Sequence, residues 1–431
     1  MKTVIVWFRS DLRLHDNRVL ARAIEQGDRL ICVYVHDPRH DVTTRWGFPR
    51  MDRHRRFFLA DTLRDLDSAL MRAGHGLWLS RGRPAEVLPE LAKAVNATSV
   101  FCERIAAPEE EQDVADVRAA GIEVETIWQS SLIDPDDLPF EMSALPQVFT
   151  AFRKRLEAEG VQPRPPIATP NELPPPVTLP PESTSIDRMF GSTSVVHDDR
   201  SSFPYAQREF RGGESAALGH LERYFAGTLP QRYKHTRNGL EGVDYSTKFS
   251  PWLATGALSP RVLYAALKSH EGSQGANEST YWIWFELLWR DYFRFLHLQH
   301  GARLYRAAGL TREPPPPHDA ARFDAWRAGR SGELFNDAGM RELAATGYLS
   351  NRLRQNVASW LINDLNGDYR AGAAWFESQL VDYDPCSNQG NWLYLAGRGT
   401  DPREGRRFDP VRQSRMYDPD GTYRLLWNRG D

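Results

Sequence analysis

Short apolar runs alternate with longer amphipathic segments through the N-terminal third of the chain. The runs have strand length and predict β-strands over 3–8, 30–37, 76–80, 99–103 and 122–128. The segments between them predict helices over 17–26, 51–73, 84–95 and 108–120, and Pro84 and Pro108 stand where first helical turns begin. Apolar strands that alternate with helices are typical of a doubly wound parallel sheet. Residues 1–135 therefore predict a Rossmann-like α/β domain.

The pattern changes twice after this domain. Residues 161–181 are rich in proline, which argues against helix or central strand and predicts an extended connector. The polar stretch that follows is expected to be loop too, so 136–202 is predicted as a linker. Strand patterns then vanish, and 203–431 predicts an all-α domain. Its helices are expected over 214–225, 259–270, 279–300, 331–346, 350–364 and 371–380.

One stretch, residues 375–403, concentrates side chains suited to binding a ligand. Asp382, Asp384, Asn388, Trp392 and Tyr394 fall within thirteen residues of it. Carboxylates, an amide and aromatics mixed with proline and glycine predict neither a good helix nor a good strand. We expect the wall of a site there, where the backbone approaches a flat ligand.

Polar residues also follow the first predicted strand, in the sequence FRSDLRLHDN. Ligands of a doubly wound sheet bind beyond the carboxyl ends of its strands. Asp11, Arg13 and Asp16 form the polar rim of such a site, or Asp16 is the N-cap of the next helix. No glycine-rich fingerprint follows the strand, which argues against a dinucleotide bound in the usual Rossmann mode.

A loop of hydroxyl side chains lies ahead of a predicted helix in the second domain. Ser246, Thr247 and Ser250 precede Pro251, which is typical of a first helical turn. Hydroxyls and free backbone N–H groups at a helix N-terminus suit a diphosphate. Ordinary helix capping is the alternative interpretation of the same residues.

The predicted helix over 279–300 carries Glu286, Trp289 and Arg290 on adjacent faces. Charged side chains are rarely buried without a partner, so these residues indicate either a site or an amphipathic surface helix. Arg354 and Asp382 are expected to form an ion pair, either across a cofactor site or as a structural bridge.

Composition narrows the classes of function. A formal charge of -3 excludes a basic nucleic-acid-binding coat over the whole chain but allows a local cationic groove. Cys32, Cys102 and Cys386 are too few for a disulfide framework and lack zinc-binding spacing, so we expect a cytoplasmic protein without a metal site. No apolar stretch approaches the length of a membrane-spanning helix. We expect the protein to be a monomer.

Five motifs, in order along nearly the whole chain, carry a family resemblance. They are WFRSDLRLHDN, YSTKFSPWLATGALSPR, STYWIWFELLWRDYFRF, LSNRLRQNVASWLINDL and DYDPCSNQGNW. Together they resemble the photolyase/cryptochrome family, and in detail its DASH cryptochrome branch. Any one motif would be weak, whereas five at the family's spacing are specific.

The resemblance implies FAD held non-covalently, in a U shape, by the helical domain. Arg354 and Asp382 match the family's ion pair against the isoalloxazine ring, Asp384 matches a contact to its pyrimidine edge, and Asn388 matches the residue that faces flavin N5. The cofactor-binding residues implied in this way are Tyr233, Ser246, Thr247, Phe249, Ser250, Glu286, Arg290, Asn351, Arg354, Asp382, Asp384 and Asn388.

The reaction that the resemblance implies is light-driven electron transfer from FADH⁻, which splits cyclobutane pyrimidine dimers. Its catalytic residues would be Glu286, Asn388 and Trp392, with Glu286 as the proton partner of the lesion. Asn388 cannot act as an acid at N5, which favours the fully reduced anionic cofactor. The alternative function is a blue-light photoreceptor or regulatory cryptochrome that binds nucleic acid without significant repair.

The implied partner is DNA, preferentially single-stranded. Gln355 and Tyr394 stand where relatives that repair duplex DNA carry Met and Trp. A more polar pocket holds a flipped dimer less well and recovers less of the cost of unpairing. The lesion-contacting residues implied are Glu286, Trp289, Gln355 and Tyr394. Arg403, Arg406 and Arg407 are candidate contacts to DNA phosphates, or ordinary solvated arginines of the surface.

The family usually reduces its flavin through three tryptophans that lead to the surface. Trp392 matches the one next to the flavin, but the middle position falls on Tyr369 and the outer one on Pro316. Tyrosine must release a proton when it is oxidised, and proline carries no electron. Trp360 and Trp375 are alternative carriers or ordinary core residues.

Many relatives hold a second, light-harvesting chromophore. The segment CERIAAPEEEQDV matches the family's antenna side, with Ile105 where relatives tend to have Glu, while Glu109 and Glu110 are kept. We expect 5,10-methenyltetrahydrofolate or another antenna chromophore.

Overall fold

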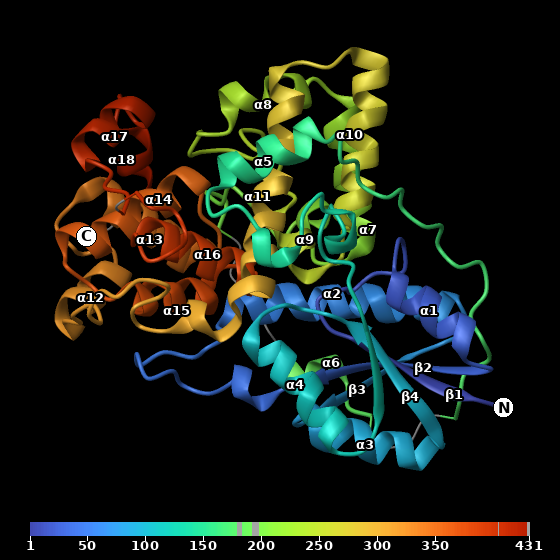
Figure 1. The fold of residues 1–431 in the computed structure, drawn as a ribbon. Coiled ribbons are helices and arrows are strands. Elements are labelled where there is room, and N and C mark those ends of the chain that lie inside the picture. Colours follow the sequence, from blue (N-terminus) through green and yellow to red (C-terminus); the bar gives the residue numbers. More distant parts are fainter. Residues whose placement is uncertain (179–182, 192–197, 404, 429–431) are drawn as a thin grey trace.

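A parallel five-stranded sheet forms the N-terminal part of the computed structural model, which describes residues 1–178, 183–191, 198–403 and 405–428 (Figure 1). Its order is β3–β2–β1–β4–β5, so the connections change direction between β1 and β4. Ligands of such sheets bind beyond the strand ends at this switch point. The predicted strands are confirmed as β1 (Thr3–Phe8), β2 (Arg29–His36), β3 (Leu77–Arg81), β4 (Ala97–Glu103) and β5 (Glu123–Ile127).

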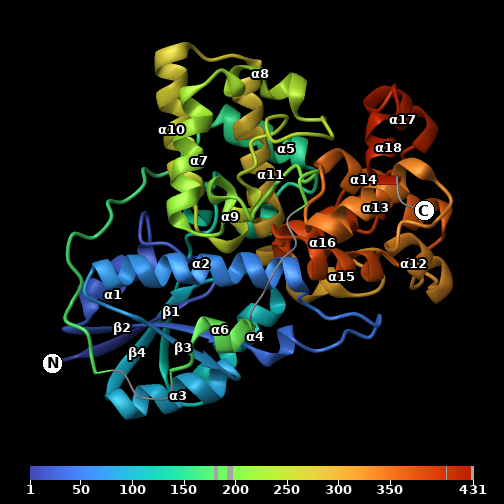
Figure 2. The ribbon, with the colours of Figure 1, turned by 180° about the vertical axis from the view of Figure 1, so that it is seen from behind.

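Helices cover both faces of the sheet, as predicted for a doubly wound domain (Figures 1 and 2). On one face α1 (Arg18–Gln26) and α2 (Arg53–Arg72) pack against Val4, Val6 and Phe8 of β1. On the other face α3 (Pro84–Val95) and α4 (Pro108–Ala119) pack against the alternate residues of the same strand. Both helices begin with their proline, as expected.

The interpretation of Asp16 as a helix cap or as part of a ligand-binding rim is wrong. Asn17 caps α1 instead, with its side chain accepting from the backbone N–H of Leu20. Asp16 is fully buried and pairs with Arg261 at 2.9 Å, across the boundary with the helical part. Arg13 donates to the backbone oxygen of Gly256 at 2.8 Å. These charges join the two parts of the chain, because a buried carboxylate needs a buried cation.

The segment 136–202 differs from the predicted linker. Its described residues contain the helices α5 (Phe149–Ala158) and α6 (Ile186–Phe190) and the short 3₁₀ turns η2 (Pro135–Asp137), which begins one residue before it, and η3 (Met142–Ala144). Phe149, Phe152 and Leu156 of α5 are buried in the core of the helical part. These three residues have helical spacing in the sequence, but the proline-rich segment that follows led to the prediction of a linker. Residues 161–178 are extended, as expected, while 179–182 lie outside the described residues.

Helices make up the described C-terminal part, which confirms the predicted all-α architecture. In its first half it contains η4 (Arg208–Phe210), α7 (Glu214–Ala226), α8 (Leu229–Thr236), α9 (Ser250–Thr255), α10 (Pro260–Gln274), α11 (Glu278–His300) and η5 (Gly301–Tyr305). There follow α12 (Ala320–Arg327), α13 (Leu334–Thr346), α14 (Asn351–Ser359), the π-helical turn η6 (Trp360–Asp364), α15 (Tyr369–Gln379), α16 (Pro385–Leu395), α17 (Pro410–Tyr417) and α18 (Thr422–Asn428). None of the helices that the structure describes is long and apolar enough to cross a membrane.

The expectation that residues 375–403 lack good helix is wrong, because 375–379 form the end of α15 and 385–395 form α16. Asp384 is the N-cap of α16 and accepts from the backbone N–H of Ser387, and Pro385 occupies the first turn. Both residues favour a helix start even though they disfavour a helix interior. The helix gives the polar residues of this stretch fixed directions.

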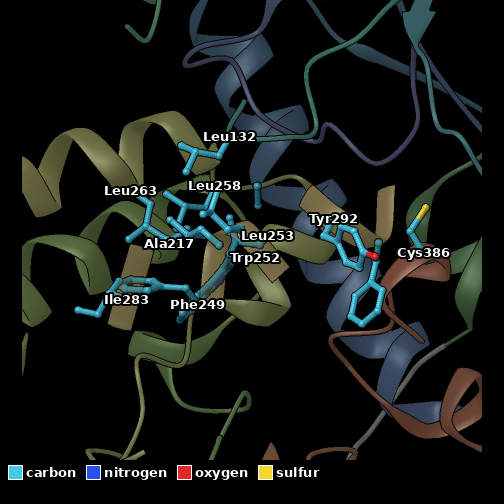
Figure 3. Close-up of a cluster of buried hydrophobic side chains, with 14 of the residues drawn as sticks. Leu132, Ala217, Phe249, Trp252, Leu253, Leu258, Leu263, Ile283, Tyr292 and Cys386 are labelled. Atoms are coloured by element: carbon cyan, nitrogen blue, oxygen red, sulfur yellow. The ribbon is translucent and has the colours of Figure 1, made fainter. Parts of the chain in front are cut away.

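Two aromatic-rich cores hold the helical part together. The larger one centres on α9 and α11 and includes Trp252, Ile283 and Tyr292 (Figure 3). Leu132 from the loop after β5 packs into the same core, so the two parts of the chain share buried apolar surface. The second core surrounds Trp392 on α16. The candidate site lies between these cores.

Candidate cofactor and substrate site

A cavity of about 450 Å³ lies within the helical part, in the size range of small-molecule sites. It is enclosed by α8, the loop before α9, α11, α14 and the start of α16. Most of the predicted site residues line it although they are far apart in the sequence: Tyr233, Ser246, Thr247, Phe249, Ser250, Glu286, Trp289, Arg290, Asn351, Arg354, Gln355, Asp382, Asp384 and Tyr394.

A smaller void of about 80 Å³ adjoins this cavity. Arg354, Gln355 and Asp382 line both spaces, so the smaller one is a side lobe of the larger. Asn388 and Trp392 line the lobe only.

Two ion pairs fix the carboxylates at the buried end of the cavity. Arg354 donates to Asp382 at 2.9 Å, as predicted, and Arg294 donates to Asp384 at 2.5 Å. Burial alone would raise the pKa of Asp384, but the guanidinium groups of Arg294 and Arg290 outweigh it and lower the pKa to about 2. Asp384 is therefore charged at neutral pH, as its double use as helix cap and ion-pair partner requires.

Two buried polar atoms at the cavity have no hydrogen-bond partner within the described residues. They are Oδ1 of Asp382 and Nζ of Lys248. The ammonium of Lys248 lies over the ring of Tyr245 at 3.3 Å, and burial lowers its pKa well below the usual value. Buried polar groups without partners are costly, so a hydrogen-bond acceptor and a cation in one cavity indicate a ligand with N–H groups and negative charge. FAD, with its imide edge and diphosphate, fits both.

The hydroxyl loop faces the cavity and is not used for capping. The N-cap of α9 is Phe249, and no side chain caps that helix. The hydroxyls of Ser246 and Thr247 are thus left for other partners, which contradicts the capping interpretation. The loop is held by His220, whose Nε2 lies 2.9 Å from the backbone oxygen of Thr247.

The solvent side of the cavity carries Glu286 and Trp289, both on α11. Glu286 pairs with Arg237, whose guanidinium lies 4.4 Å from the centre of the Trp282 ring. Trp289 stacks on Phe149 with ring centres 3.8 Å apart. Helix α5, which was not predicted, thus supports one wall of the cavity. The interpretation of α11 as a plain surface helix is wrong.

Gln355 and Tyr394 add hydrogen-bonding groups to the cavity wall. Oε1 of Gln355 accepts from Arg352 at 2.9 Å, and the hydroxyl of Tyr394 accepts from Arg406 at 3.0 Å. Tyr394 also meets the edge of the Trp289 ring, at 5.9 Å between centres. The wall is therefore polar at these positions, as the sequence predicted, and the two arginines add positive charge beside it.

Asn388 and Trp392 lie one helical turn apart on α16. The side-chain amide of Asn388 donates to the backbone oxygen of Ala373 at 3.0 Å. This contact fixes the side chain and leaves its carbonyl oxygen available as an acceptor. Trp392 is 1% exposed and touches Phe376 and Trp326.

Some predicted residues are engaged elsewhere. Arg403 is exposed and pairs with Asp401, and it does not line the cavity. Tyr369 lies outside the cavity wall and donates to the backbone oxygen of Arg306 at 2.9 Å. Arg290 does line the cavity, but its guanidinium donates to the backbone oxygens of Ser130 and Leu253.

Three cations of the site were not predicted: two line the cavity, and Arg294 pairs with Asp384 in its wall. Lys248 stands within the hydroxyl loop, Arg237 follows Tyr233 by one helical turn, and Arg294 follows Arg290 by one turn of α11. The i,i+4 spacing of both arginines from predicted residues was a usable signal. Lys248 gave none, because a lysine in a polar loop is usually exposed.

Family models match both parts of the chain. The model described as DNA photolyase covers residues 4–171, and the model described as FAD binding domain of DNA photolyase covers residues 282–428. The second range includes Glu286, Arg354, Asp382 and Asn388. The match to an FAD-binding model agrees with the inference from the unpaired polar atoms of the cavity that its ligand is FAD.

Individual relatives match over nearly the whole chain. A protein of Xenopus laevis named Cryptochrome DASH is 47% identical over 99% of this chain and 82% of its own length. The crystal structure of a Synechocystis cryptochrome has a TM-score of 0.94 and 43% identity, covering 99% of this chain and 88% of that one. A Sulfolobus tokodaii photolyase, whose structure is described as containing two FAD molecules, has a TM-score of 0.77 and 26% identity, covering 99% and 90%. The chain belongs to the photolyase/cryptochrome family of FAD-binding proteins, alongside the DASH cryptochromes.

Proposed function

We propose that this protein repairs cyclobutane pyrimidine dimers in single-stranded DNA, using FAD and blue light. The observation that carries the proposal is one cavity with a buried charged end and a solvent-facing side that carries Glu286 and Trp289. The side chain of Glu286 on the open side is 33% exposed, whereas that of Asp382 at the buried end is 3% exposed. A base that enters from solvent meets Glu286 and Trp289 before it reaches the buried carboxylates.

The side chains at the buried end suit the parts of FAD. Lys248 and the hydroxyls of Ser246 and Thr247 would hold the diphosphate, since cations and hydroxyls are its usual partners. Oδ1 of Asp382 would accept from an N–H of the isoalloxazine ring. The fixed carbonyl of Asn388 would accept from N5–H of the reduced ring. When bound and reduced, FAD supplies the electron that light excites.

The open side suits an extruded pyrimidine dimer. Trp289 is held flat by Phe149 and offers a stacking surface. Arg237 is ion-paired with Glu286 in the free protein, and a DNA phosphate that draws Arg237 away would free the carboxyl to meet the lesion. Glu286 therefore contacts substrate only after this pair has opened.

The preference for single strands rests on Gln355 and Tyr394. Their hydrogen bonds to Arg352 and Arg406 keep this part of the wall polar. Flipping a dimer out of a duplex costs a few kcal/mol, which apolar and aromatic contacts normally recover. A polar wall recovers less, whereas a dimer in a single strand has little unpairing cost to recover.

The test is a blue-light repair assay on oligo(dT) dimers, single-stranded and in duplex, with the FAD-loaded protein. Glu286→Ala is expected to lower single-strand repair by about 10²-fold, the usual effect of a positioned acid or base. Glu278→Ala is the matched control, because Glu278 lies on the same helix and pairs with Lys234 outside the cavity. Wild-type protein should repair the single strand faster than the duplex.

Two results would contradict the proposal. Equal repair of both substrates under the same light would remove the strand preference. FAD-loaded protein that repairs neither would favour the second candidate, a blue-light photoreceptor. The name cryptochrome among the relatives favours that second function.

A second chromophore is proposed for a cavity of about 170 Å³ at the carboxyl ends of β1 and β2. Ile105, Glu109 and Glu110 line it, together with Arg39 and Arg50. Burial raises the pKa of Glu110 to about 7. We propose a folate such as 5,10-methenyltetrahydrofolate there; the two FAD molecules described for the Sulfolobus tokodaii relative support the presence of a second chromophore but not its identity. The absorption spectrum of the purified protein tests this, since a flavin spectrum with no second chromophore would contradict it.

A further inference from the structure

We propose that electrons reach Trp392 from the surface through Trp326, with Phe323 as a bridge and Trp46 as the exit. The inference rests on the proposed function only in requiring bound, light-excited FAD. It replaces the route that Tyr369 and Pro316 leave incomplete.

The first step is a contact between two buried indoles. Trp392 and Trp326 have ring centres 6.4 Å apart at an interplanar angle of 76°, an edge-to-face arrangement. They are 1% and 0% exposed. Trp326 is fixed by its Nε1–H, which donates to the backbone oxygen of Val357 at 2.9 Å. Electron tunnelling falls steeply with distance, so a fixed indole in ring contact is a better donor than a more distant one.

The path from Trp326 to solvent is aromatic throughout. Phe323 stacks on Trp326 with ring centres 5.7 Å apart and lies 6.5 Å from the ring of Trp46. Trp46 is half-buried and meets the exposed ring of His318 at 4.6 Å. Phenylalanine is too hard to oxidise to hold the charge, so Phe323 serves as a bridge. Trp46 is the indole at which this path reaches water.

The surroundings of Trp46 suit it to end the chain. The guanidinium of Arg45 lies 4.4 Å from the centre of its ring. A cation there disfavours the indole radical cation and favours loss of the indole N–H proton to water. Because a neutral radical at the surface cannot easily pull an electron back from Trp326, the charge separation is prolonged.

Tyr369 is poorly placed for the same role. Its hydroxyl donates to the backbone oxygen of Arg306 at 2.9 Å, and burial raises its pKa to about 12. A backbone carbonyl does not accept a proton, so oxidised Tyr369 has nowhere to release one. Among the described residues no ring contact joins Tyr369 to Trp392.

The other candidate tryptophans fit less well. Trp360 donates to Ser331 and has no ring contact within the described residues. Trp375 connects to Phe323 through Phe48, at 5.0 and 6.1 Å. It is 7% exposed and lies 5.5 Å from the guanidinium of Arg327, so a positive charge on it would be disfavoured and shut off from water.

The electrons balance along this path. Trp392 gives one electron to the excited isoalloxazine ring and takes one from Trp326. Trp326 takes one from Trp46, which releases its indole proton to water. A thiol in solution then gives Trp46 an electron and a proton, so the tryptophans end unchanged and the thiol is oxidised.

The experiment measures two things on FAD-loaded protein in blue light. One is the rate of flavin photoreduction with dithiothreitol. The other is oxidation of Trp46, read by peptide mass spectrometry after illumination in air without thiol, when dioxygen adds to the surface radical. The variants are Trp326→Phe, Trp46→Phe and Tyr369→Phe. Trp427→Phe is the matched control, because Trp427 is buried in the same core and stacks with Arg200.

Trp326→Phe is expected to lose most photoreduction and the oxidation mark on Trp46, with FAD content and melting temperature close to those of Trp427→Phe. Trp46→Phe, which changes a half-buried loop residue, should slow photoreduction without loss of stability. Tyr369→Phe should keep both signals. The route is overturned if Tyr369→Phe abolishes photoreduction while Trp326→Phe leaves it intact, or if Trp46 is not oxidised in wild type. If the protein repairs DNA but gives either of these contradicting outcomes, the proposed function stands and only the electron-transfer route through Trp326 and Trp46 is wrong.

Discussion

At the scale of single residues, the cavity is defined by polar atoms that lack partners. Lys248 is 1% exposed, and its ammonium has aromatic rings around it but no hydrogen-bond acceptor among the described residues. Such an arrangement lowers the stability of the free protein and is relieved by an anionic ligand. The residue thus links cofactor binding to the stability of the fold.

Replacing Lys248 by Met is expected to have opposite effects on the free and loaded protein. FAD affinity should fall by about tenfold or more, because a charge-assisted hydrogen bond contributes roughly 1.5–3 kcal/mol. The free protein should melt at a higher temperature, since no ammonium is buried. Fluorescence titration of FAD and melting of both forms measure this.

Lys234→Met is the control for that change, because Lys234 pairs with Glu278 away from the cavity. It should leave FAD affinity unchanged. If Lys248→Met binds FAD as tightly as wild type, the lysine has no part in holding the cofactor.

At the scale of elements, the cavity depends on a close crossing of α11 and α16. A Cβ added to Gly390 on α16 would lie 2.1 Å from Cδ1 of Phe293 on α11. Only glycine therefore allows this separation of the two helices. The crossing sets where Asn388 and Trp392, on the same helix as Gly390, stand relative to the cavity.

Gly390→Ala is expected to lower the free energy of unfolding by about 1–3 kcal/mol, the usual cost of overpacking a core. It should also weaken FAD retention, because α16 must move away from α11. Urea unfolding and the ratio of flavin to protein absorbance measure the two effects.

The matched control is Gly219→Ala in α7, where the added Cβ would lie 3.5 Å from Nη1 of Arg223. Alanine there should be neutral or add about 0.5–1 kcal/mol through helix propensity. If both variants behave alike, the crossing of α11 and α16 is not as tight as the structure has it.

At the scale of the whole molecule, buried charges connect the sheet to the helices. Asp16 pairs with Arg261, and the carboxylate of Asp291 accepts from the backbone N–H groups of Leu132 and Ile133. Glu103 at the end of β4 is buried and has no hydrogen-bond partner for either carboxylate oxygen within the described residues. Such groups make stability depend on pH.

The contribution of Glu103 to the free energy of unfolding is expected to fall as pH rises from about 5 to 8. Burial, with the like charge of Asp11, raises the pKa of Glu103 to about 8, and Arg13, Arg294 and Arg9 only partly offset it. A raised folded pKa gives stability that is complete below the unfolded value near 4.5 and is lost as pH rises through the folded one. Glu103→Gln should remove this contribution, which changes by on the order of 3 kcal/mol between pH 5 and pH 8.

Urea unfolding at several pH values measures the slope. Glu123→Gln, an exposed change on the neighbouring strand, should keep the wild-type slope. An unchanged slope in Glu103→Gln would show that Glu103 ionises as easily in the folded protein as in the unfolded chain.

Local patterns in the sequence were enough to predict the five strands, the flanking helices and the all-α second part. They rest on apolar periodicity and on residues such as Pro84 and Pro108, whose effect is confined to a few neighbours. The motifs likewise predicted most of the cavity wall, including the pair of Arg354 with Asp382. They failed for α5, which precedes the proline-rich segment, and for α16, where Asp384 and Pro385 begin a helix although both residue types disfavour a helix interior.

The tertiary structure alone decided which distant side chains meet. Asp16 is a link to Arg261 rather than a cap, Glu286 is paired with Arg237, and Trp326 makes a ring contact with Trp392. Hydrophobic periodicity gives the face of an element that is buried, but not the partner it is buried against. That partner is set by how helices cross and pack, which depends on the whole chain.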